Sequence, residues 1–590
     1  MGPSSETRTT KYAQCVELAV VGAGPHALSL MTKILEPRVD PLEEVPCNTS
    51  LFKVNGSLVK ARFEGEGPAR LVSSKDSDLR RFEHDSRANA KGRASILNRC
   101  FVADPSGCWM RQWEHQFSAL GIPMLRSPIT AHPDPIDGDM LRKFADETKR
   151  RGADAIEVDL SRTEQYHGPF EAPSTSLFNA FCHSVVARYG LEGRVHGARV
   201  SRLVPIPPPL LIDLDGADRQ GELSPSCNCG DWRCRDDKPW FELHLDDGTL
   251  VLAKNVVVAT GSLGRPALPA WAIKARDIYS EFQEAAQTLL HSNDIIARPD
   301  EAASTCSICS TSSSLASGQH QAEIKAAVTL PGLHFNPGGN DVLLVVGGGL
   351  TAGHLALRAL RSHPNVRVVI ASRRPIFQRQ FDLDLKWMGL QRKTYISRFW
   401  SCESMAERRA ILKESKNGGS MTPEVLCDLR KYEACGRLEF LQSAEVIGAH
   451  WECDTCNWLV SFDVGDERIF NAIWCATGTI TDFGTEKLFD DLRQYSAARG
   501  ENIRVEGGIP CLTEDLRLAE NLNVFIMGNA AALRVGPGAL NLMGGKAAAG
   551  RIAEALHLGL RDSENKWTAR DKRQGRRRCS RTLRKIQIRG

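Results

Sequence analysis

Two glycine-rich segments carry the residues whose types and spacing suit phosphate binding. The first is GAGPHA at residues 22–27, and the second is GGGLTA at residues 347–352, 325 positions further along the chain. In such a motif the first glycine permits a tight turn, the second lets the backbone approach a pyrophosphate, and a small third residue lets the following helix pack on its strand. Free amide groups and the dipole of that helix bind the phosphates. Two such motifs predict a protein that holds two dinucleotides and moves electrons between them.

Each motif needs a strand before it and a helix after it to bind a nucleotide. An apolar run at 16–21 precedes the first motif, and the helical pattern after it extends to about residue 35, before Pro37. A run at 341–346 precedes the second, whose helix extends to about residue 362. The residues that we expect to bind the cofactors here are Gly22, Gly24, Pro25 and Ala27 at the first turn, and Gly347, Gly349 and Thr351 at the second.

Charged residues follow the next strand of each unit. Asp104 follows the strand expected at 99–103, where an acid accepts the ribose hydroxyls of a dinucleotide. The usual spacing is about 20 residues, so this assignment requires residues 37–98 to be an insertion; the alternative is an ordinary turn residue. In the second unit Arg373 and Arg374 follow the strand at 366–371, with no acid beside them. Paired guanidinium groups suit a 2′-phosphate, which favours NADPH over NADH; the alternative is a solvated arginine pair.

Composition indicates a globular protein of two or three domains. The chain has 590 residues, of which 42% are hydrophobic and 25% charged. No apolar run approaches the roughly 18 residues of a membrane span, and the polar N-terminus has no signal-peptide core, so we expect a cytoplasmic protein with no membrane partner. Residues 566–590 contain eleven Lys or Arg and one Asp, a sum of +10, so the other 565 residues sum to 4 − 10 = −6. This basic tail is expected to be disordered, and either solvated or in contact with an acidic partner.

Eighteen cysteines on a chain without an export signal indicate reduced thiols. Three groups stand out: Cys227, Cys229 and Cys234; the CxxC pair Cys306 and Cys309; and the CxxC pair Cys453 and Cys456. Zinc would need four ligands brought together from these segments, and no metal site is expected. A redox-active CxxC pair stays open as an alternative function.

The order of these motifs resembles that of flavoproteins with two dinucleotide folds, and within them the lysine/ornithine N-monooxygenase family (class B flavoprotein monooxygenases). The segments that carry the resemblance are GAGP at 22–25, ADPSGCW at 103–109, LRSPITAHPDP at 125–135, LLHSNDI at 289–295, GGGLTAGH at 347–354, SRRP at 372–375 and CATGT at 475–479. The resemblance implies an α/β fold with two Rossmann-like domains, the first for FAD and the second for NADPH. It also implies that Gly528 and Asn529, with the helix after them, close over the flavin, and that Trp109 packs near the isoalloxazine ring.

The chemistry that the resemblance implies belongs to the cofactors. NADPH would reduce FAD, reduced flavin would react with O2 to give a C4a-hydroperoxyflavin, and that species would hydroxylate a small amine, with lysine or ornithine as the lead. No catalytic side chain is assigned, and His26, His132 and His291 are expected to be structural hydrogen-bond partners. Two alternatives stay open: an NADPH-dependent reductase that uses a CxxC pair, and a non-catalytic regulator with the flavoprotein fold.

The expected domains follow from the positions of these motifs. The FAD-binding domain covers 14–270, with an insertion at 37–98, and is completed by 520–560. The NADPH-binding domain covers 271–519, with a flexible insertion at 299–339 and a helical substrate-side segment at 385–436. Residues 561–590 form the basic tail, and no oligomeric state is predicted.

Overall fold

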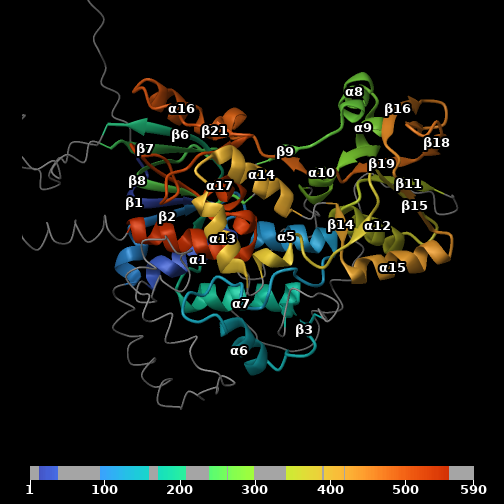
Figure 1. Cartoon of the computed structure of the whole chain (residues 1–590). Helices are drawn as coiled ribbons and strands as arrows, with labels where there is room; N and C mark the ends of the chain where they lie inside the picture. Colours follow the sequence, from blue (N-terminus) through green and yellow to red (C-terminus); the bar gives the residue numbers. More distant parts are fainter. Residues whose placement is uncertain are drawn as a thin grey trace, which may run out of the picture.

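The computed structural model describes residues 12–36, 93–158, 170–207, 238–261, 264–297, 341–388, 391–416 and 419–556. The expected insertion at 37–98 lies outside these residues except for 93–98. The insertion at 299–339 and the tail at 561–590 lie outside them entirely. The described residues form two lobes, each built on a sheet with a parallel core (Figure 1).

The first sheet contains the apolar run at 16–21 that precedes the first glycine motif. Its strand order is β23-β24-β8-β1-β2-β5, with β7 and then β6 added beside β8. β1 pairs in parallel with β2 and β8, and Val21 lies level with Ala103 and Val258. Ala19 and Val20 are fully buried, as expected for a central strand covered on both faces. The strands are β1 Gln14–Val21, β2 Cys100–Ala103, β5 Val195–His196, β6 Val200–Ile206, β7 Trp240–Leu245, β8 Leu250–Val258, β23 Arg517–Ala519 and β24 Leu522–Ile526.

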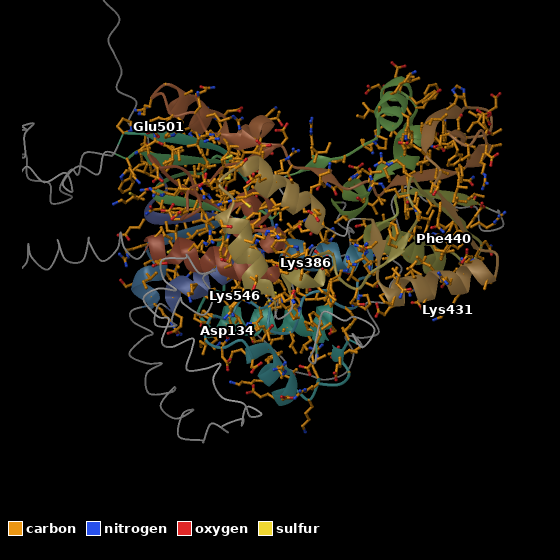
Figure 2. The ribbon with its side chains drawn as sticks, viewed as in Figure 1. Asp134, Lys386, Lys431, Phe440, Glu501 and Lys546 are labelled. Carbon is orange, nitrogen blue, oxygen red and sulfur yellow. The ribbon has the colours of Figure 1, made fainter. Side chains whose placement is uncertain are left out.

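The second sheet is parallel throughout, in the order β10-β19-β11-β12-β15. One apolar cluster joins this sheet to α12 and α15, and a second joins its other face to α8, α9 and a three-stranded antiparallel sheet. The elements are β10 Leu289–His291, β11 Val342–Val346, β12 Arg367–Ser372, β15 Leu438–Gln442, β19 Ala472–Cys475, α8 Ala270–Ile278, α9 Gln283–Thr288, α12 Leu350–Ser362, α15 Pro423–Ala434, β16 Val446–Glu452, β17 Asn457–Phe462 and β18 Glu467–Phe470. Figure 2 labels Lys431 and Phe440 in this lobe, and Asp134 and Lys546 in the first.

The chain passes between the lobes through a short antiparallel pair, in which β9 Arg265–Pro266 lies beside β20 Thr479–Ile480. The remaining elements cover the sheets or connect them. They are α5 Arg111–Leu120, α6 Met140–Glu147, β3 Ala155–Glu157, β4 Glu171–Pro173, α7 Thr175–Arg188, α10 Ser292–Ala297, β13 Phe377–Gln378, η4 Leu385–Trp387, α13 Arg392–Ser401, α14 Met405–Ser415, β14 Ser420–Met421, η5 Phe483–Thr485, η6 Lys487–Phe489, α16 Asp490–Ala497, β21 Val505–Glu506, β22 Ile509–Pro510, η7 Gly528–Ala531, α17 Ala532–Val535, η8 Pro537–Leu540 and a helix at 542–556.

The residues that pack in the core of the first lobe do not match the domain boundary expected at residue 519. Phe399, Leu412 and Phe489 belong to the apolar core of the first sheet, although all three fall within the expected second domain at 271–519. The segment at 385–436 is largely helical as expected, but β14 interrupts it, and α13 and α14 pack on the first lobe while α15 packs on the second. The chain therefore returns to the first lobe before the expected boundary, because the apolar faces of these helices are buried there.

Within the described residues, none of the helices has both the length and the apolar character needed to span a bilayer.

Candidate dinucleotide sites

The first glycine turn contacts the carboxyl ends of two strands, β2 and β8. Gly22 follows β1 with φ +107°, and a Cβ atom placed on it would lie 2.7 Å from the carbonyl oxygen of Ala259, just after β8. Its N–H donates to the carbonyl of Ala103, the last residue of β2, at 2.8 Å. Both the positive φ and the close approach to backbone require glycine at this position.

The start of α1 Pro25–Leu35 is open to a ligand. Gly24 is the N-cap of this helix, no side chain caps the helix, and its first turn contains no acid. A Cβ on Gly24 would meet nothing within 4 Å. Pro25 occupies the first helical position, and Ala27 is fully buried, so the helix packs closely on the sheet. The first-turn amides are therefore not claimed by a capping side chain, which fits a site for the phosphates of a dinucleotide.

Asp104 lies at this turn despite its distance along the sequence. It follows β2, whose last residue is level with Val21, and its Oδ2 accepts the N–H of Ala23 at 3.0 Å. Its Oδ1 accepts the N–H of Ser106 at 2.9 Å and the hydroxyl of Ser106 at 2.6 Å. The carboxylate is thus held beside the glycines, where an acceptor for ribose hydroxyls is expected. The ribose contact itself stays a prediction.

The second glycine turn repeats the geometry of the first. Gly347 follows β11 with φ +143°, and a Cβ on it would lie 2.4 Å from the carbonyl oxygen of Ala476, just after β19. Its N–H donates to the carbonyl of Ala371 near the end of β12, at 2.8 Å. Gly349 is the N-cap of α12, again with no side-chain cap and no first-turn acid, and Thr351 is the second residue of that helix. In both lobes an Ala-Thr-Gly segment therefore supplies the carbonyl against which the first glycine packs.

Arg373 and Arg374 directly follow β12, next to this turn. The preceding residue, Ser372, lies close to Gly348: a Cβ atom placed on Gly348 would lie 2.4 Å from the Ser372 hydroxyl. The same hydroxyl donates to the carbonyl of Arg374 at 2.7 Å. The Arg373 side chain is 76% exposed and lies 3.6 Å from the Glu445 carboxylate. Both arginines therefore lie beside the second glycine turn, and their contact with a 2′-phosphate stays a prediction.

The C-terminal segment lies against the first glycine turn. Gly528 follows β24, and a Cβ on it would lie 2.8 Å from the carbonyl oxygen of Gly261. Asn529 donates from Nδ2 to the Thr481 hydroxyl at 2.8 Å, which joins the first lobe to the segment that follows β20. In the helix at 542–556, a Cβ on Gly545 would lie 2.3 Å from the ring of His26 in the first turn of α1. The contact of Gly528 and Asn529 with a flavin stays a prediction.

Trp109 lies in the core of the first lobe. Its side chain is 4% exposed, and its indole N–H donates to the carbonyl of Leu191 at 2.9 Å. The next residue, Met110, donates its N–H to the carbonyl of Ala23 in the glycine turn at 2.8 Å. Trp109 therefore anchors the segment that follows Asp104, and its packing against an isoalloxazine ring stays a prediction.

The three histidines expected to be structural are buried, and burial lowers the pKa of each, to about 3 for His132. His291 shows the role most clearly. Its Nδ1 accepts the N–H of Asn293 at 3.1 Å, so its Nε2 carries the proton and donates to the carbonyl of Gly478 at 2.9 Å. The neutral ring thus holds the Ala-Thr-Gly segment of the second site, a connection that sequence reasoning did not make.

The cysteine pair within the described residues shows no link to either turn. Cys453 and Cys456 are exposed free thiols between β16 and β17. The other two cysteine groups lie outside the described residues. Across the described residues, no group of three or more His, Cys, Asp or Glu side chains is arranged to hold a metal ion.

No protein-family model matches the chain, and no curated protein matches its sequence. Solved structures do match its fold. An ornithine hydroxylase from Pseudomonas aeruginosa is 13% identical, with a TM-score of 0.54 over 92% of this chain and 100% of that one. An ornithine N-hydroxylase from Kutzneria sp. 744, solved with reduced FAD, NADP+ and L-ornithine, is 15% identical, with a TM-score of 0.53 over 92% and 99%. L-lysine 6-monooxygenase from Pseudomonas syringae is 14% identical, with a TM-score of 0.52 over 92% and 99%. The chain therefore has the fold of these enzymes over almost their whole length.

Proposed function

We propose that this protein is an FAD- and NADPH-dependent monooxygenase that hydroxylates the nitrogen of a small amine. The observation that carries the proposal is the duplicated site: two glycine turns, each closed by an Ala-Thr-Gly carbonyl and each opening an uncapped helix. One such turn would serve a protein that binds a single nucleotide. Two turns in one chain provide for an electron donor and a second redox cofactor.

The residues at each turn suit the cofactor proposed for it. Gly22, Gly24, Pro25 and Ala27 would hold the pyrophosphate of FAD, with Asp104 on its ribose. When bound, FAD supplies the redox chemistry, since it takes a hydride from NADPH and then activates O2.

At the second turn Gly347, Gly349 and Thr351 would hold the pyrophosphate of NADPH, and Arg373 and Arg374 would bind its 2′-phosphate. His291 would orient this site as a positioning residue through the carbonyl of Gly478, 2.9 Å from its Nε2.

Contacts between the lobes support transfer between the two sites. The β9–β20 pair and the bond from Asn529 to Thr481 join the lobes beside the Ala-Thr-Gly segments at 259–261 and 476–478. These contacts would keep the two cofactors in a fixed relation, which hydride transfer needs because reacting atoms must lie about 3–3.5 Å apart.

The proposed substrate class comes from the structural neighbours. Two of them hydroxylate ornithine, one is a lysine 6-monooxygenase, and another is a cadaverine monooxygenase from Erwinia amylovora, 12% identical with a TM-score of 0.51. All three compounds carry a primary amine at the end of an alkyl chain. We therefore propose an alkyl primary amine as the substrate.

The test is NADPH oxidation by purified, FAD-loaded protein with ornithine, lysine and cadaverine in turn, with hydroxylamine product and hydrogen peroxide measured together. Hydroxylamine formed in proportion to NADPH, with one of these amines, supports the proposal. NADPH oxidation that yields only peroxide with every amine contradicts the substrate class. Failure to bind FAD at all contradicts the whole proposal.

A further inference from the structure

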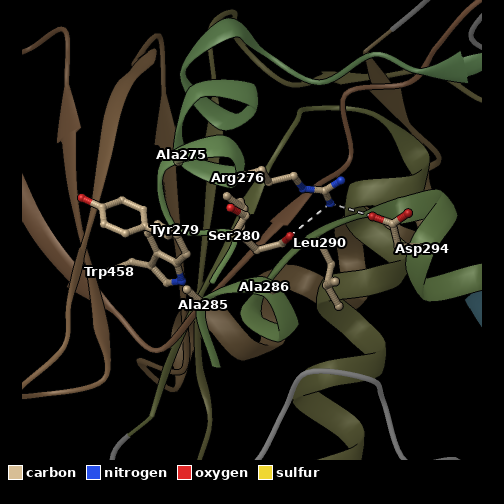
Figure 3. A pocket seen from close by; sticks show the side chains of 10 residues that line it. Ala275, Arg276, Tyr279, Ser280, Ala285, Ala286, Leu290, Asp294 and Trp458 are labelled. Atoms are coloured by element: carbon tan, nitrogen blue, oxygen red, sulfur yellow. Dashed lines mark hydrogen bonds and ion pairs between the residues drawn. The ribbon is translucent and has the colours of Figure 1, made fainter. Parts of the chain in front are cut away.

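A pocket of about 520 Å³ lies on the second lobe (Figure 3). Residues of α8, α9, β10, α10 and β17 line it, and none of them belongs to the turn at 347–351 or to residues 372–374. Its volume falls in the usual range for pockets that bind small molecules. The proposed function does not use this pocket.

One end of the pocket is an aromatic wall. The rings of Tyr279 and Trp458 meet edge to face, with centroids 5.8 Å apart and an angle of 82° between their planes. The indole N–H of Trp458 donates to the hydroxyl of Thr288 at 2.9 Å, and the Tyr279 hydroxyl is bonded to Nδ1 of His450. Trp458 is only 1% exposed, so it supports the ring of Tyr279 from behind, and the half-buried Tyr279 ring is the aromatic surface that a ligand can reach.

The other end carries hydrogen-bond donors. Nη2 of Arg276 donates to Asp294 at 2.6 Å and to the carbonyl of Leu289 at 3.1 Å, as the dashed lines in Figure 3 show. Within the part of the chain that the structure describes, Nε and Nη1 of Arg276 make no hydrogen bond. Burial alone would raise the pKa of Asp294, but the bonds from Arg276 and from the N–H of His291 lower it overall, so the carboxylate is ionised and balances the guanidinium.

The charged residues of the segment that forms most of the pocket favour a neutral ligand over an anionic one. Residues 270–297 contain two cations, Lys274 and Arg276, and four acids, Asp277, Glu281, Glu284 and Asp294, a sum of −2. A ligand carboxylate on Arg276 would lie beside the carboxylate of Asp294, the one acid in the pocket lining, and this repulsion disfavours an anion. A neutral oxygen acceptor meets no such repulsion, and it can take the N–H groups that Arg276 leaves unused.

We infer that this pocket binds a neutral aromatic compound with a carbonyl oxygen, its ring against Tyr279 and its oxygen on Arg276. The inference does not depend on the proposed monooxygenase activity. It is tested by calorimetric titration of the FAD-loaded full chain, with NADP+ present at saturation so that neither nucleotide site can take the probe. The probes are 2-naphthamide and 2-naphthoate, which share a ring system and differ in charge.

Two variants in the pocket and one control outside it test whether the probe binds at this site. Ala286 is an exposed residue of α9 that lines the pocket, so Ala286→Leu narrows the pocket without entering the core. Ala410→Leu, on an exposed position of α14, is the matched control. Arg276→Lys keeps a charge for Asp294 but removes the unused guanidinium donors. A hydrogen bond to a charged group corresponds to roughly a tenfold or larger change in affinity.

We expect 2-naphthamide to bind at least tenfold more tightly than 2-naphthoate. Ala286→Leu and Arg276→Lys should each weaken the binding of 2-naphthamide about tenfold. Ala410→Leu should leave its binding unchanged. The inference is overturned if 2-naphthamide does not bind up to its solubility limit, if Ala286→Leu binds it as the wild type does, or if the anion binds as well as the amide.

Discussion

Replacing the first glycine of each turn gives the sharpest test of the duplicated site. Gly22→Ala would force a side chain to φ +107° and would place its Cβ 2.7 Å from the carbonyl oxygen of Ala259. A residue held in a sparsely populated backbone region costs about 1–3 kcal/mol, and overpacking costs about 1–3 kcal/mol more. The expected loss is roughly 2–6 kcal/mol, a large part of the 5–15 kcal/mol that stabilises a typical domain.

Gly24→Ala is the matched control for folding at the same turn. Its φ is −82°, and its added Cβ meets nothing within 4 Å, so we expect this variant to fold normally. The second lobe offers the same comparison. Gly347→Ala would bring a Cβ to 2.4 Å from the carbonyl oxygen of Ala476, whereas a Cβ on Gly349 has its nearest neighbour at 3.8 Å.

The assay measures flavin absorbance of the purified protein, NADPH affinity by titration, and thermal unfolding. Gly22→Ala should lose bound FAD and unfold at a lower temperature. Gly347→Ala should keep its FAD and lose NADPH affinity. Wild-type stability and flavin content in Gly22→Ala would refute the reasoning about the turn. Loss of FAD alone from both Gly22→Ala and Gly347→Ala would refute the assignment of separate nucleotides to the two lobes.

Three further outcomes are expected. Arg373→Ala with Arg374→Ala should weaken NADPH binding roughly tenfold or more and NADH binding little, because a charge-assisted contact is lost; equal weakening of both nucleotides would exclude a 2′-phosphate contact. Burial lowers the pKa of His132 from 6.5 to about 3, so the unfolded chain takes up a proton below pH 6.5 before the folded chain does. The stability that His132 contributes is complete above pH 6.5 and falls by about 2 kcal/mol at pH 5. The unfolding temperature of His132→Asn, measured by calorimetry, should therefore depend less on pH between 7 and 5 than that of the wild type. An unchanged pH dependence would show that His132 is not responsible. Cys453→Ser with Cys456→Ser should leave NADPH oxidation unchanged, whereas its loss would support the reductase alternative.

Local sequence patterns were enough to predict the individual strands and helices and the two glycine turns. The apolar run before each glycine motif forms the expected buried strand. The helices after the motifs begin at Pro25 and Leu350, directly after the N-cap residues Gly24 and Gly349. The side chain of Thr422 caps α15, and Pro423 occupies the first position of that helix. These features depend on residues within a few positions of one another, so a local pattern is enough to predict them. The fold that the resemblance implies agrees with that of the structural neighbours for the same reason, since its motifs lie at these junctions.

Contacts between residues far apart in the sequence became visible only in the three-dimensional structure. It places Asp104 level with the first glycine turn although 81 positions separate it from Ala23, because parallel pairing of β1 with β2 sets their relative height. It shows that the carbonyls of Ala259 and Ala476 close the two turns, and that α13 and α14 belong to the first lobe. It also brings Arg276 together with Tyr279 and Trp458 in a pocket that no motif indicates. Strand register and the burial of amphipathic helices depend on the whole chain, so neither can be read from a local pattern.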